Sequence, residues 1–147
     1  MRYLSFTLAD SIYGLPVERV EVVLEMQPIT RVPNAKPQLR GVINHRGSVV
    51  PVIDPRISLA CGYGAESAIA KSIIVMQLSY EGEDITIGVL ADAVREVVDI
   101  ASEELEPPPS VVGGTNGGFI RNVARQADGF IVLLDVDTAF LPVPAGT

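Results

Sequence analysis

The sequence predicts an all-β protein made of two similar small β-barrels packed on a shared hydrophobic seam, with a few short helices. Three observations lead to this prediction. Short runs rich in β-branched residues recur along the chain, each bounded by Gly, Pro, Asn or Asp. Two blocks of sequence match later blocks in the same order. Apolar residues make up 48% of the 147 residues, enough to form a core without disulfides or metals. We expect one domain, 1–147, formed by two closely packed barrel lobes.

The predicted elements follow from local patterns of the chain. Strands are expected at Tyr3–Leu8, Ile12–Leu15, Val42–Asn44, Ser48–Ile53, Ser72–Tyr80, Ile85–Leu90, Phe119–Ala124 and Phe130–Leu134. Short helices are expected at Pro16–Val23, Ala35–Leu39, Pro55–Ala60, Asp92–Val97 and Asp135–Phe140, several of which begin at or just after Pro or Asp. Two loops are expected at Cys61–Ala68 and Glu106–Gly118.

A comparison of the chain with itself suggests a duplication. At an offset of 81 residues, the later block IRNVARQADGFIVLLDV aligns with LRGVINHRGSVVPVIDP and places Asp135 on Asp54. At an offset of 74, IGVLADAVREV aligns with YGLPVERVEVV and places Gly88 on Gly14. Because both blocks keep their order, we predict two barrels whose hairpins, around Gly47 and around Asp128, superpose without belonging to one continuous sheet.

Composition narrows the classes of function. The net charge is −7 and no basic stripe is present, which argues against a nucleic-acid partner. The single Cys61 excludes an intrachain disulfide and fits a reducing compartment. The N-terminal MRYLSFTLAD alternates polar and apolar residues, unlike a signal peptide, and no run approaches the ~18 apolar residues of a membrane span. We therefore expect a cytoplasmic protein with no direct membrane insertion.

No catalytic or metal site stands out in the sequence. His45, the one histidine, lies in a predicted turn, and we expect it to be partly exposed with no carboxylate fixed beside it. One His and one Cys cannot form a His/Cys zinc site, and neither CxxC nor HExxH occurs. Asp54 and Asp135 precede predicted helices and are interpreted as N-caps. The sequence thus predicts a protein that is not an enzyme and needs no cofactor and no metal.

One family resemblance covers nearly the whole chain, from about Tyr3 to Phe140. The segments ITRVPNAKPQLRGVINHRGSVVPVIDPR, YGLPVERVEVV, IGVLADAVREVV and FIRNVARQADGFIVLLDVDTAF resemble the CheW family of bacterial chemotaxis adaptors. The resemblance implies two five-stranded, SH3-like β-barrels with a hydrophobic seam and no enzymatic activity. It also implies two partners, the helical hairpin tip of methyl-accepting chemoreceptors and the regulatory domain of a CheA-type histidine kinase, at membrane-associated receptor arrays.

Candidate binding residues follow from the resemblance together with the general physics of helix-in-groove recognition. For the receptor we expect a groove along the seam, with Val20, Val32 and Val94 near it, Gly41 beside it and Arg46 at its rim. For the kinase we expect an apolar barrel end; the candidates are Met26, Ile29 and Val42. The chain departs from the family pattern at four positions: Val22 stands where Glu is usual, His45 and Pro55 where Leu is usual, and Asn122 where Gly is usual.

Two other functions remain open from the sequence. One is a small barrel enzyme that uses His45 and Asp54 as a base pair, which predicts a deep polar pocket beside them. The other is a CheW-like interaction module of a divergent pathway, such as pilus motility or surface sensing, that binds another regulator. The first alternative depends on His45 and Asp54 lying together in space, and the second on which partners the chain binds.

Overall fold

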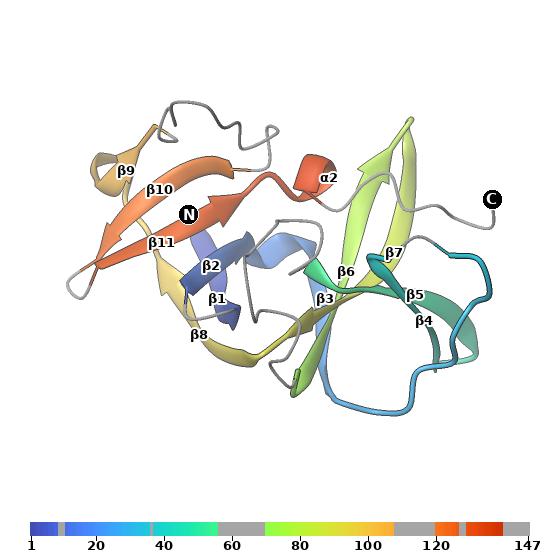
Figure 1. Cartoon of the computed structure of the whole chain (residues 1–147). Helices are drawn as coiled ribbons and strands as arrows, with labels where there is room; N and C mark the ends of the chain where they lie inside the picture. The colour runs from blue at the N-terminus through green and yellow to red at the C-terminus, as the bar shows by residue number, and fades with distance from the viewer. Residues whose placement is uncertain (9–10, 36, 56–69, 108–119, 127–128, 140–147) are drawn as a thin grey trace.

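The computed structural model describes residues 1–8, 11–35, 37–55, 70–107, 120–126 and 129–139. Its strands form two curled sheets that lie side by side (Figure 1). Barrel I contains β3 (Val20–Glu25), β6 (Ser72–Tyr80), β7 (Glu83–Ala91), β5 (Ser48–Ile53) and β4 (Leu39–His45), in that spatial order. Barrel II contains β8 (Ala93–Asp99), β1 (Arg2–Leu8), β2 (Ser11–Pro16), β11 (Gly129–Leu134), β10 (Ile120–Gln126) and the two-residue β9 (Leu105–Glu106). The N-terminal hairpin therefore completes the barrel built from the C-terminal strands.

The strand registers confirm the predicted duplication. Gly14 pairs with Leu133 in a parallel ladder, and Gly88 pairs with Val52 in the same way, which are the partners that the offsets of 74 and 81 require. The hairpins β4–β5 and β10–β11 also share one register. In each hairpin the pairing shifts by one residue after the first pair, between Leu39 and Gly41 in one and between Ile120 and Asn122 in the other. The two hairpins belong to separate sheets. The pseudo-equivalent of any residue in one barrel can therefore be read from its offset.

Three helix predictions are wrong. In the segment Pro16–Val23, only Val17–Arg19 is helical, as the 3-10 turn η1, and β3 begins directly after it. The predicted helix Asp92–Val97 lies mostly in strand β8. The described part of Ala35–Leu39 contains a turn that leads into β4. The valines decide the first two cases, because β3 and β8 pair with β6 and β1, and β-branched residues in these ladders outweigh the weak helical pattern. The helix α2 (Val136–Ala139) confirms the prediction after Asp135. The predicted loop Cys61–Ala68 and most of Pro55–Ala60 and Glu106–Gly118 lie outside the described residues.

Three apolar clusters make up the core. One fills barrel I around Ile73 and Val75, and another fills barrel II around Ile131 and Leu133. The largest cluster lies between the barrels and takes residues from both sheets: Leu4, Phe6, Leu8, Leu15, Ile53, Ile74, Met76, Leu78, Ile87, Val89, Ala91, Leu134 and Val136. This third cluster is the shared hydrophobic seam that the sequence predicted.

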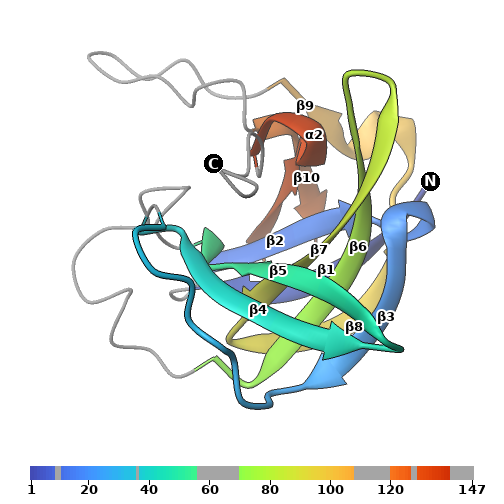
Figure 2. The ribbon, with the colours of Figure 1, turned by 90° about the vertical axis from the view of Figure 1, so that its right-hand side faces the viewer.

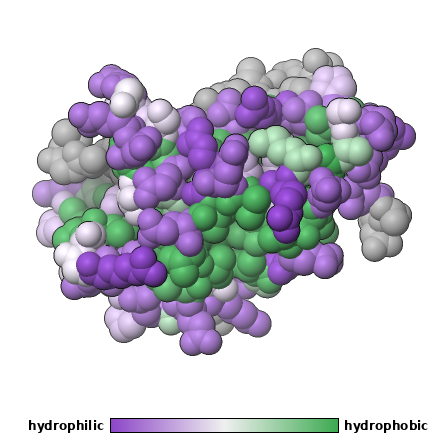
Figure 3. Space-filling model, turned by 180° about the vertical axis from the view of Figure 1, so that it is seen from behind, coloured by the Kyte–Doolittle hydropathy of each residue, from purple (hydrophilic) through white to green (hydrophobic). Residues whose placement is uncertain are grey.

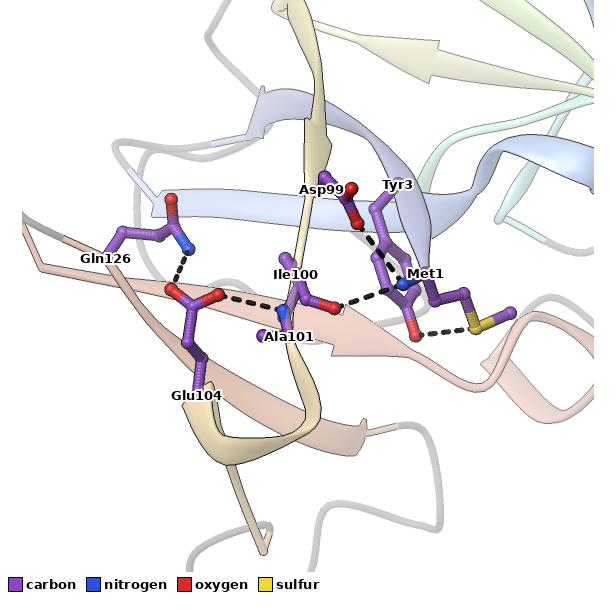
Figure 4. Close-up of polar contacts among 7 residues, drawn as sticks. All are labelled: Met1, Tyr3, Asp99, Ile100, Ala101, Glu104 and Gln126. Carbon is purple, nitrogen blue, oxygen red and sulfur yellow. Dashed lines mark hydrogen bonds and ion pairs between the residues drawn. The ribbon is translucent and has the colours of Figure 1, made fainter.

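Polar contacts fasten the outer end of barrel II (Figure 4). The amino group of Met1 donates to the Ile100 carbonyl at 3.1 Å and forms an exposed ion pair with Asp99. The Glu104 carboxylate accepts from the Ala101 N–H at 2.8 Å, in the 3-10 turn η3 (Ser102–Glu104). It also accepts from Gln126 on β10, so that η3 is tied to the last hairpin.

Candidate functional site

An apolar strip lies on the side of the molecule where the barrels meet. Val20 on β3 and Val94 on β8 are pseudo-equivalent, and both are half-buried against the seam core. Farther along the same strands, the pseudo-equivalent Val23 and Val97 are 40% and 41% exposed. Figure 2 shows β3 at this side of the molecule, and Figure 3, seen from behind, shows a band of apolar atoms between polar margins. We call Val20, Val23, Val94 and Val97 the valine strip.

Arg46 lies in a two-residue turn between β4 and β5. Its φ is +54° and that of Gly47 is +81°, which is the backbone of a type I′ hairpin turn. The Asn44 side chain accepts a hydrogen bond from the Gly47 N–H at 2.9 Å and stabilises the turn. The arginine side chain is exposed, so the turn presents a cation to solvent instead of using it in the core.

His45 has an acidic neighbour that the sequence did not predict. Its Nε2 lies 3.2 Å from Oε2 of Glu21 on β3, and its side chain is only 12% exposed. The expectation of a histidine with no carboxylate beside it is therefore wrong. The other carboxylate oxygen of Glu21 accepts from Gln77 on β6, which also donates to the Thr86 hydroxyl at 2.7 Å. β3 and β4 are the two edges of barrel I, so this cluster joins them across the closure of the barrel.

Asp54 has a different partner at the opposite end of the hairpin. Its carboxylate is buried and pairs with the Arg40 guanidinium at 3.2 Å. His45 pairs with Ser48 at the start of β5, whereas Asp54 follows the last residue of that strand, about 20 Å away at the usual rise per residue. The pairing of His45 with Asp54 as a catalytic base pair is therefore contradicted. The N-cap interpretation of Asp54 and Asp135 stays a prediction.

Gly41 has a structural role that its sequence position did not reveal. Its φ is +149°, and a Cβ atom built there would lie 2.1 Å from the Thr30 carbonyl oxygen. The close approach arises because Thr30 and the neighbouring Val42 exchange two backbone hydrogen bonds, of 2.9 and 2.8 Å. Gly41 is thus needed for docking the segment before β4, whatever its part in binding. At the pseudo-equivalent position Asn122 donates to the Glu106 carbonyl at 3.2 Å.

A second surface surrounds the segment from Met26 to Arg40. This segment lines a concavity of 820 Å³, whose wall includes Ile29 and the exposed side chains of Met26 and Val32, with Arg31 and Arg40 as its charged groups among the described lining residues. Val42 is half-buried and docks the segment through Thr30. Val32 therefore lines the same concavity as Met26 and Ile29, and its assignment to the receptor groove stays a prediction. We call this surface the Met26–Arg40 concavity.

One ion pair between the barrels was missed by sequence reasoning. Arg19 in η1 binds Asp137 of α2 through two hydrogen bonds of 3.0 and 2.9 Å, and Asp137 also accepts from the Ser79 N–H of β6. Burial alone would raise the pKa of Asp137, but the hydrogen bonds from Arg19 and Ser79 outweigh it and hold this pKa below its usual value. Since α2 follows β11 of barrel II, the pair fastens barrel II to barrel I. No local pattern could reveal a contact across 118 positions.

The described residues contain no group of three or more His, Cys, Asp or Glu side chains arranged to hold a metal ion. In the same ranges, no helix is long and apolar enough to cross a membrane.

Comparisons with known proteins give one consistent result. A family model described as "CheW-like domain" matches residues 2–140. The chain is 30% identical to the chemotaxis protein CheW of Bacillus subtilis, over 85% of this chain and 77% of that protein. It is 29% identical to the CheW of Thermotoga maritima, over 91% and 83%. The crystal structure of the scaffolding protein TtCheW from Thermoanaerobacter tengcongensis matches with a TM-score of 0.80 and 30% identity, covering 96% of this chain and 92% of that one.

Proposed function

This chain belongs to the family of CheW-like domains, and we propose that it is the non-enzymatic adaptor that couples chemoreceptors to a CheA-type histidine kinase in a chemotaxis array. The observation that carries the proposal is the valine strip, an apolar surface bordered by polar groups on an otherwise acidic protein. Single exposed valines are ordinary, but pseudo-equivalent valines of both barrels gather at one seam.

The valine strip suits the helical hairpin at the tip of a receptor. A helix is recognised by apolar side chains spaced along its buried face, which requires an apolar groove of modest width. Val20 and Val94 are half-buried and form the floor of the strip. Val23 and Val97 are more exposed and present their side chains to the partner. Arg46 supplies a cation from the neighbouring turn, and such a charge adds specificity and speed of association more than affinity.

The Met26–Arg40 concavity is the surface that we assign to the kinase. It combines apolar side chains with Arg31, while the charge of Arg40 is paired with Asp54, so it favours a partner surface that is mainly apolar with an acidic margin. Ile29 and Val42 hold the concavity in place, while Met26 and Val32 supply the exposed contact area. With two separate surfaces the protein holds receptor and kinase at the same time, and the array supplies the effective concentration. We accordingly propose that the adaptor acts in the cytoplasm at membrane-associated receptor arrays.

Charge reversal at Arg46 tests the proposal. Arg46→Glu is expected to fold normally, with a change in unfolding free energy of about 0.5 kcal/mol or less, because the side chain is exposed. Affinity for a receptor-tip fragment should fall by a few kcal/mol, about a hundredfold, while affinity for the kinase regulatory domain should not change. Unchanged receptor affinity would remove Arg46 from the site.

A second pair of variants tests the valine strip itself. Val97→Asp should abolish receptor binding, because it buries a carboxylate against an apolar helix face. Val49→Asp is the matched control, since Val49 is 74% exposed on β5, outside the strip. Both affinities would be measured by isothermal titration calorimetry, with the melting temperature of each variant as a folding check. Equal receptor binding by the two variants would contradict the assignment of the strip.

A further inference from the structure

We propose that Glu21, His45 and Arg46 form a charged rim that selects a receptor helix with an acidic end, and that protonation of His45 strengthens this binding. The inference rests on the proposed receptor function and assigns its specificity. It arises from a contact that barrel closure creates: Nε2 of His45, the last residue of β4, lies 3.2 Å from Oε2 of Glu21 on β3. Arg46 follows His45 directly in the exposed turn.

The backbone explains how Glu21 reaches His45. Along β3, Val20 pairs with Met76 and Val22 with the adjacent Val75, so Glu21 is an extra residue in a β-bulge. A bulge turns its side chain away from the regular alternation of the strand. Glu21 consequently points across the closure of the barrel toward β4, where His45 ends the strand directly before Arg46. The bulge therefore links the rim to the valine strip, since Val20 directly precedes Glu21 on β3.

The other barrel indicates that the fold does not require this pair. The pseudo-equivalents of Glu21 and His45, by offsets of 74 and 81, are Arg95 and Gln126. These two residues line a cavity of 160 Å³ at the matching closure of barrel II. Barrel II thus carries a cation and an amide at these two positions, and its Gln126 binds Glu104 instead of Arg95. The acid and imidazole of barrel I are accordingly a local feature of the face that carries the valine strip.

The charges of the rim determine whether receptor affinity rises or falls with pH. In the described part of the chain, Glu21 is the charged group in contact with the imidazole, Gln77 and Thr86 from β6 and β7 complete the cluster without charge, and Arg46 follows in the turn. With neutral His45, the negative charge of Glu21 opposes the attraction of Arg46 for a partner carboxylate. Protonated His45 neutralises Glu21 and leaves the rim with a net positive charge. An acidic helix end should therefore bind more tightly as the pH falls.

The experiment measures the affinity of the full chain for a soluble receptor-tip hairpin at pH 7.5 and at pH 5.5, a range in which histidine side chains can change charge. We expect the native chain to bind about three- to tenfold more tightly at pH 5.5, a range set by screened charges several ångströms apart. His45→Gln copies the residue of barrel II and should give a flat pH profile. Glu21→Gln should bind at pH 7.5 about as tightly as the native chain does at pH 5.5.

The pH profiles distinguish failure of the rim proposal from failure of the adaptor function. A flat profile for the native chain, with binding retained, would overturn the rim proposal and leave the adaptor function intact. An equal slope in His45→Gln would assign the pH dependence to the receptor fragment and would also overturn it. Failure of the native chain to bind the fragment at any pH would overturn the adaptor function and this inference with it. Melting temperatures of all variants at both pH values show whether a loss reflects misfolding.

Discussion

Substitution of Gly41 by alanine should damage the protein through its fold. Two costs add at this position. A non-glycine residue at φ +149° lies in a region essentially restricted to glycine and costs about 1–3 kcal/mol. The new Cβ would also displace the Thr30 carbonyl, 2.1 Å away, and so break two backbone hydrogen bonds worth about 0.5–1.5 kcal/mol each. The expected loss in unfolding free energy is about 3–5 kcal/mol, a large part of the ~5–15 kcal/mol of a typical domain.

Gly47→Ala is the matched control for this prediction. Gly47 also has a positive φ, +81°, but a Cβ there would have no atom within 4 Å. Only the backbone cost applies, and we expect a loss of about 1 kcal/mol. Urea unfolding followed by circular dichroism measures both variants, with the slope of each transition checked against the native chain. If the two variants differ by less than about 1 kcal/mol, the close contact between Gly41 and Thr30 does not limit stability, and the reasoning is refuted.

Three further predictions concern the seam, the turn and the ion pair. Met76→Ala should cost about 2–5 kcal/mol and keep one cooperative urea transition, because the fully buried Met76 belongs to the core that both barrels share; two transitions would mean that the barrels fold independently. Arg46→Asn should keep or slightly raise the melting temperature, since Asn tolerates a positive φ better than Arg; a clear fall would show that the arginine stabilises the turn. Asp137→Asn should cost up to about 1 kcal/mol at pH 7, a modest value because both partners are about one-third exposed. The folded pKa of Asp137 is lowered, so this stability is present above the unfolded pKa of about 3.9 and is lost as the pH falls through the folded value. The variant and the native chain should therefore become equally stable near pH 2, and a difference that persists there would contradict the assignment.

The duplicated architecture could be predicted because its signals are local and ordered. Alternating β-branched segments identified most of the strands, and the offsets of 74 and 81 recovered ladder partners such as Gly14 with Leu133 and Gly88 with Val52. The exposed Arg46 turn was also predictable, because Gly47 follows it between two strands. The helix predictions over β3 and β8 failed, since a valine-rich segment of six or seven residues fits either period until a partner strand is known.

The sequence by itself determined the fold class, the duplication, the family and the two kinds of partner surface to seek. The tertiary structure alone decided which side chains meet: Glu21 with His45, Arg19 with Asp137, and Thr30 against Gly41. It also grouped Val32 with Met26 and Ile29 in the Met26–Arg40 concavity and separated His45 from Asp54. The physical reason is that strand pattern depends on neighbours one or two residues apart, whereas these contacts depend on a bulge, on barrel closure and on crossings of the chain between barrels.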